Sequence, residues 1–101
     1  MDTRNDKIDG DLDLAYALRL NGMVTGTITV KRGGQLELNG MCGQDLVLEG
    51  GARADVYGTV VGWAVNRGGC LSVFGTVVAG IADEAGDTIV AKGAVVQGQV
   101  R

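Results

Sequence analysis

Glycine recurs along this sequence at an almost constant interval, in two separate series. The first series has spacings of 18, 18, 17 and 18 residues and consists of Gly22, Gly40, Gly58, Gly75 and Gly93. The second has spacings of 18, 18 and 17 and consists of Gly33, Gly51, Gly69 and Gly86. Both series lose one residue in the same stretch, near Cys70 and Leu71, so they record one structural period. In a chain of 101 residues, this period predicts a stack of about five repeats.

Apolar residues follow the same period and alternate with polar residues inside each repeat, as in Leu18, Leu20 and Val24. Alternation of this kind predicts short strands with one buried side. The positions expected to point inward form four columns: Leu18, Leu36, Ala54, Leu71, Ile89; Leu20, Leu38, Val56, Val73, Ala91; Val24, Cys42, Val60, Val77, Val95; and Ile28, Leu46, Ala64, Ile81.

Eighteen residues divide into three faces of about six residues, each made of a short strand and a corner. We therefore predict an all-β fold, a single-stranded three-sided parallel β-solenoid (β-helix) of about five coils of 17–18 residues. Each strand is expected to pair with its equivalent in the next coil, about 4.8 Å away. Glycine suits the corners because it tolerates positive φ and close backbone approach. The prediction is one domain over residues 1–101, with residues 8–14 as a partial first coil and residues 1–7 as a polar N-terminal cover.

Composition narrows the function classes. The chain has no histidine, which removes the commonest general base and the commonest metal ligand. Its net charge of −3 disfavours nucleic acid as a partner, and no apolar run is long enough for a membrane-spanning helix. Asp9, Asp11 and Asp13 resemble the start of a calcium loop, but Leu14 and Leu20 occupy the places of its required Gly and Glu. We predict no catalytic residue, metal or cofactor. Two reduced thiols, Cys42 and Cys70, and the lack of a secretory signal favour a cytoplasmic protein.

Three segments resemble the bactofilins, the polymer-forming β-helix proteins of the bacterial cytoskeleton. They are Ile8-Asp-Gly-Asp-Leu, Leu18-Arg-Leu-Asn-Gly-Met-Val-Thr-Gly-Thr-Ile and Val73-Phe-Gly-Thr-Val, within a likeness that runs from about residue 8 to the end. The resemblance implies a right-handed three-sided solenoid that stacks end to end into non-polar filaments without nucleotide, and it carries no catalytic motif. The chain lacks the family's long tails, so the resemblance speaks for the fold more than for filaments.

The positions between the inward columns point outward, and along one face they change from acidic to apolar. We predict an interaction surface on the later coils that contains Tyr57, Val61, Trp63, Phe74, Val78 and Val96. An alternative for Trp63 is a register slip that places its ring inside and Ala64 outside. Tyr57 and Phe74 are expected to lie on adjacent coils, either as a stacked ladder that stiffens the solenoid or as anchors of the surface.

Charged positions repeat as well. Lys31, Glu49, Arg67 and Glu84 alternate in sign along one column, as do Arg19 and Glu37. Such cross-strand pairs are worth about 0.2–1 kcal/mol each and oppose register slips, so we interpret this column as structural.

The last coil is expected to leave unpaired strands, because a solenoid end exposes backbone groups unless something covers it. This end-on edge comprises Ile89, Ala91, Val95 and Val100.

An enzyme is the least favoured class: left-handed hexapeptide acyltransferases share the coil length, but their catalytic histidine is absent here. Two hypotheses remain. One is a non-catalytic scaffold that self-associates as an oligomer or filament. The other is a small protein-binding module, such as an immunity or inhibitor protein that caps a partner.

Overall fold

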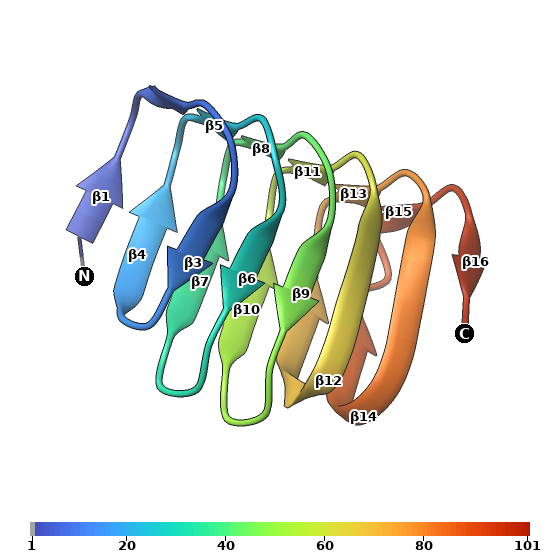
Figure 1. Ribbon diagram of the computed structural model, residues 1–101. Helices are drawn as coiled ribbons and strands as arrows, with labels where there is room; N and C mark the ends of the chain where they lie inside the picture. Colours follow the sequence, from blue (N-terminus) through green and yellow to red (C-terminus); the bar gives the residue numbers. More distant parts are fainter. Residues whose placement is uncertain (1) are drawn as a thin grey trace.

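The structure is a computed structural model that describes residues 2–101. The described chain winds around one axis, with the two termini at opposite ends of the stack (Figure 1). Its elements are short strands joined by tight corners, and the described residues contain no helix. All strand pairs are parallel, and each pair joins two successive coils. The predicted all-β parallel solenoid is confirmed, with about six turns rather than five.

The strands form three faces. The first face contains β1 (Asp2–Arg4), β4 (Ala17–Leu20), β7 (Gln35–Leu38), β10 (Arg53–Val56) and the later halves of β12 (Trp63–Val73) and β14 (Gly80–Val90). The second face contains β2 (Lys7–Ile8), β5 (Met23–Val24), β8 (Met41–Cys42), β11 (Thr59–Val60), β13 (Thr76–Val77) and β15 (Val95–Val96). The third face contains β3 (Leu12–Leu14), β6 (Ile28–Val30), β9 (Leu46–Leu48), the first halves of β12 and β14, and β16 (Gln99–Val100).

Inward side chains stack in register and fill the interior. Leu18 pairs with Leu36, Leu36 with Ala54, and Ala54 with Leu71. Each of these four residues is at most 1% exposed, and the inward columns are buried from coil two to coil five, up to Ile81. The alternation of apolar and polar residues therefore predicted the core correctly for these coils.

Glycine is required at corners of the coils for two physical reasons, close backbone approach and positive φ. A Cβ on Gly40, Gly58 or Gly75 would collide with the carbonyl oxygen of the preceding glycine of the same series, so these corners require backbone-to-backbone contact. Gly33 and Gly51 of the second series instead have φ of +84° and +80°, a left-handed conformation that only glycine adopts easily.

The lost residue of the period lies at one corner. β12 and β14 each run through this corner as a single strand of 11 residues, and their pairing shifts between Asn66 and Cys70. In the two preceding coils the same corner is a turn, closed by the bonds Gly34 N–H to Lys31 O and Ala52 N–H to Glu49 O. Replacing a turn by extended backbone shortens the coil, which explains the spacing of 17 residues.

The register predicted for the last coil was wrong by one residue. Leu71 pairs with Thr88 and Val77 with Val96, so Ile89 and Val95 point outward. The coil regains residues in a turn closed by the bond from Ala94 N–H to Ala91 O, and a constant period cannot show this.

The expectation that residues 1–7 form a cover outside the coils also needs correction. β1 pairs with β4 and β2 with β5, so residues 2–7 are themselves part of the first coil, and Met1 lies outside the described residues. Residues 8–14 pair with residues 24–30, as predicted.

Candidate functional site

Tyr57 and Phe74 stack on adjacent coils, at the edge where the chain enters the second face. Their ring centroids are 4.9 Å apart and their planes differ by 8°. Both side chains are exposed, Tyr57 at 49% and Phe74 at 43%. The predicted stack is therefore present, and its rings also form part of the outer surface.

Val61 and Val78 lie at the opposite edge of the same face. They follow β11 and β13, which pair through Val60 and Val77, so the two valines are neighbours on adjacent coils. Val61 is 40% exposed and Val78 is half-buried. Between the two edges the outward positions are uncharged in coils two to five: Met23, Met41, Thr59 and Thr76. Interface centres are typically depleted of charge in this way.

Trp63 lies outside the core, and Ala64 is fully buried, so the register-slip alternative is wrong. The indole is half-buried. It lies close to the Cα of Gly80 in the next coil, where a Cβ would be 2.7 Å from the ring. The guanidinium of Arg101 sits 4.5 Å from the ring centroid, within cation–π range. The chain's own last coil therefore covers part of the tryptophan that was expected to be an open contact residue.

Val96 does not belong to this surface. It pairs with the buried Val77 and packs against the core, which corrects its predicted outward position. Val95, assigned to an inward column, is instead 49% exposed. The remaining surface residues are Tyr57, Val61, Phe74 and Val78 with part of Trp63, and their role in binding stays a prediction.

The C-terminal coil presents a second candidate site. Residues 87–90 of β14 pair with β12, and β15 pairs with β13, but on their other side these strands have no partner among the described residues. Apolar side chains surround this edge: Ile89 is 61% exposed, Val100 60% and Val90 43%. Ala91 is half-buried beside them. The predicted end-on residues are thus gathered on one coil.

The N-terminal coil differs in chemistry. Asp2 and Arg4 occupy the positions that pair with the buried Leu18 and Leu20, so charged residues begin these two inward columns. Arg4 donates two hydrogen bonds of 3.0 Å to the carboxylate of Asp6. These bonds hold the pKa of Asp6 below its usual value. Charged residues therefore begin two inward columns at the N-terminal end, whereas Val90 ends one of these columns at the C-terminal end.

Sequence reasoning missed the buried polar residue Asn66. It occupies the column of Leu48 and is fully buried. Its Oδ1 accepts the N–H groups of Gly68 and Gly69 at 3.2 and 2.8 Å, while its Nδ2 donates to Gly69 O, Asp87 O and Thr88 Oγ1. The side chain thus satisfies the backbone groups of the shortened corner. The shared deletion in the glycine series marked this corner, although it did not identify the residue.

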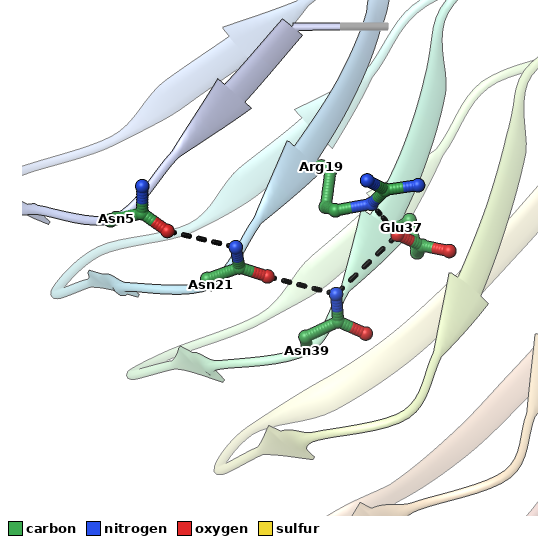
Figure 2. A network of polar contacts seen from close by, with 5 residues as sticks. All are labelled: Asn5, Arg19, Asn21, Glu37 and Asn39. Carbon is green, nitrogen blue, oxygen red and sulfur yellow. Dashed lines mark hydrogen bonds and ion pairs between the residues drawn. The ribbon is translucent and has the colours of Figure 1, made fainter.

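Sequence reasoning also missed a row of three asparagines on successive coils (Figure 2). Asn21 Nδ2 donates to Asn5 Oδ1 at 2.8 Å, and Asn39 Nδ2 donates to Asn21 Oδ1 at 2.9 Å. Asn21, Asn39 and Tyr57 follow one another at intervals of 18 residues and so occupy one column of the repeat. The amide-to-amide bonds in this column are the polar counterpart of the stack of Tyr57 on Phe74. Arg19 and Glu37 form an ion pair beside this row, and Arg67 and Glu84 form another at 3.5 Å, as predicted. The other two pairs expected in the charged column, Lys31 with Glu49 and Glu49 with Arg67, are not formed among the described residues.

The two cysteines are both free but differ in environment. Cys42 is fully buried, with its thiol 3.2 Å from Asp45 O, and burial raises its pKa. Cys70 is exposed and lines a pocket of about 610 Å³ at a corner of the later coils, with Arg53, Ser72, Asp83 and Asp87.

We expect a thiol reagent such as dithionitrobenzoate to modify one cysteine per native chain, and the second only on unfolding. The reason is that reagents react with the exposed thiolate, and Cys42 is buried with its pKa raised. Counting released chromophore with and without denaturant checks this, with Cys70→Ser as the control. Rapid native labelling of the Cys70→Ser protein would contradict the placement of Cys42.

Comparisons of the chain with family models, curated proteins and solved structures found no match. Among residues 2–101, no cluster of side chains suited to hold a metal ion occurs. The described part of the chain also has no helix long and apolar enough to cross a membrane. The exposed apolar residues described above make the second face and the C-terminal coil the two candidate sites.

Proposed function

We propose that this protein is a non-catalytic scaffold that self-associates through its C-terminal coil, in the manner the bactofilin resemblance implies. The observation that carries the proposal is the outer edge of β14 (residues 87–90), β15 and β16, for which residues 2–101 supply no partner strand. Unpaired N–H and C=O groups offer a ready template for another chain. The exposed Ile89, Val90 and Val100 beside them supply apolar area, worth about 25 cal/mol per Å² buried before the cost of association.

The charged residues that begin the inward columns favour contact between two C-terminal coils over head-to-tail stacking. One inward column begins with Arg4, continues through Leu20 and ends with Val90. In a head-to-tail stack, Arg4 of one copy would therefore lie next to Val90 of another copy in this column. An isologous pair related by a twofold axis instead brings the coil that carries Val90 and Val100 against the same coil of a second copy. Growth into a filament requires a further contact between N-terminal coils, where Ile8 and Leu12 are half-buried.

The two free thiols suit a cytoplasmic location for such a scaffold.

The second candidate function is a small module that caps a protein partner. It is favoured by the uncharged second face with its exposed Tyr57 and Phe74, since aromatic residues are common anchors of interfaces.

One pair of variants separates the two functions. We expect Val100→Lys to abolish or strongly weaken self-association, because it places a charge in the apolar end contact. Val61→Lys puts the same charge on the second face at an exposed position and should leave association unchanged. Light scattering measures the mass, and circular dichroism confirms that both variants fold. If Val61→Lys disrupts assembly while Val100→Lys does not, the second face is the contact and the end-on proposal fails.

A further inference from the structure

The chain contains the same four residues twice, at the same corner of two successive coils. The segments are Leu20-Asn21-Gly22-Met23 and Leu38-Asn39-Gly40-Met41. An Asn–Gly pair is chemically reactive, because glycine has no side chain to hinder attack of its backbone nitrogen on the asparagine carboxamide. The fold cannot avoid this pairing, since a Cβ on Gly22 or Gly40 would collide with the backbone of the preceding coil.

The reaction is deamidation. The backbone nitrogen of the glycine forms a bond to Asn Cγ and loses its proton, the Cγ–Nδ2 bond breaks, and ammonia leaves. Water then opens the resulting succinimide ring at either carbonyl, which gives aspartate or isoaspartate. The net change is one carboxamide and one water converted to one carboxylic acid and one ammonia, with no oxidant or enzyme required.

Hydrogen bonds oppose this reaction in the folded chain, at both the nitrogen and the carboxamide. The N–H groups of Gly22 and Gly40 donate to Arg4 O and Leu20 O, at 3.3 and 3.0 Å. The carboxamides are held in the asparagine row, which Figure 2 shows running from Asn5 through Asn21 to Asn39. To react, a carboxamide must leave this row and turn toward its own backbone.

The two reactive asparagines are not held equally. Asn21 is fixed at both atoms, because its Nδ2 donates to Asn5 and its Oδ1 accepts from Asn39. Asn39 is held through Nδ2 alone, by the 2.9 Å bond to Asn21 and a longer contact of 3.4 Å to Glu37 Oε2. The next residue of the column, Tyr57, continues the row with a ring and not with an amide.

We propose that Asn39 is a site of spontaneous deamidation, and that the amide row protects Asn21 until Asn39 has reacted. Conversion of Asn39 removes the Nδ2 donor, so Asn21 Oδ1 loses its partner and Asn21 is left with one bond. The new carboxylate also lies beside Glu37, and like charges at this distance repel. The row therefore opens one residue at a time, from Asn39 toward the N-terminal coil.

The repeated tetrapeptide provides an internal control for the test. The protein is aged in mildly alkaline buffer, folded or in concentrated urea, and peptide mapping by mass spectrometry follows each asparagine. In urea the two sites should react at equal rates, because their neighbours are identical. In the folded chain both should slow, and Asn21 should react about three- to tenfold more slowly than Asn39, because both carboxamide atoms of Asn21 are held whereas Oδ1 of Asn39 is free to turn. Equal native rates, or faster reaction at Asn21, would overturn the proposal.

Two variants test the role of the row itself. Asn5→Ala removes one of the two bonds of Asn21 and should raise the native rate at Asn21 without changing the rate at Asn39. Asn39→Asp imitates the first product and should also raise the rate at Asn21. Circular dichroism verifies that both variants are folded under the ageing conditions. Unchanged rates at Asn21 in both variants would show that the row does not control the chemistry.

Discussion

Gly58→Val is expected to destabilise the protein by about 3 kcal/mol or more, a large share of the 5–15 kcal/mol that a small domain commonly has. Gly58 stacks directly on Gly40, and a Cβ at position 58 would overlap the carbonyl oxygen of Gly40. The obstacle is backbone and not a flexible side chain, so two coils must separate and weaken the hydrogen bonds between them.

The matched control for this variant is Gly93→Val, at the last position of the same glycine series. A Cβ at Gly93 has open space around it and the backbone has no positive φ, so the change should cost little. Gly10→Val should lie between the two at about 1–2 kcal/mol, because Gly10 has open space but φ of +95°. Urea denaturation curves measure all three, and similar midpoints for the Gly58 and Gly93 variants would contradict the stacking of coils.

Asn66→Leu should destabilise the protein by about 2–4 kcal/mol, even though it replaces a buried polar residue by an apolar one. Leu48 occupies the equivalent position one coil earlier, so a leucine side chain fits the column by size. The cost arises because the N–H groups of Gly68 and Gly69 and the carbonyl of Asp87 lose their partner. An unsatisfied group costs about 1–3 kcal/mol where it is buried, so the losses at this corner together outweigh the gain of about 1.5–3 kcal/mol from burying leucine.

The comparison for this second prediction is Asn39→Leu, at an exposed position of the amide row. It should change the urea midpoint far less than Asn66→Leu. A midpoint for Asn66→Leu at or above that of the unmodified chain would show that the shortened corner does not need the asparagine.

The repeat made the solenoid predictable, because period and alternation together determine which side chains face inward. Leu36 and Val60, for example, were placed in the core from their spacing alone, and both are fully buried. Features that depend on departures from the period could not be predicted in the same way. The column of Val77 was continued to Val95 by counting 18 residues, whereas the turn at Ala91–Ala94 gives that position to Val96.

In the candidate site as well, only the contacts that follow the period of the repeat could be predicted. The stack of Tyr57 on Phe74 follows from two residues in one column, so the sequence was sufficient to predict it. The contact of Arg101 with Trp63 joins two residues whose coils are not adjacent, and it depends on side-chain length and direction. No column of the repeat contains both residues, so no spacing could indicate this contact.

Sedimentation velocity of the unmodified chain, run from low to high micromolar concentration, tests end-on association most directly. We expect the average mass to rise with concentration above the 10.4 kDa of one chain. Amide hydrogen exchange should slow over the same range in residues 87–90 of β14, whose outer edge is unpaired among the described residues. A single 10.4 kDa species at every concentration, with exchange in β14 unchanged, would contradict the proposed self-association.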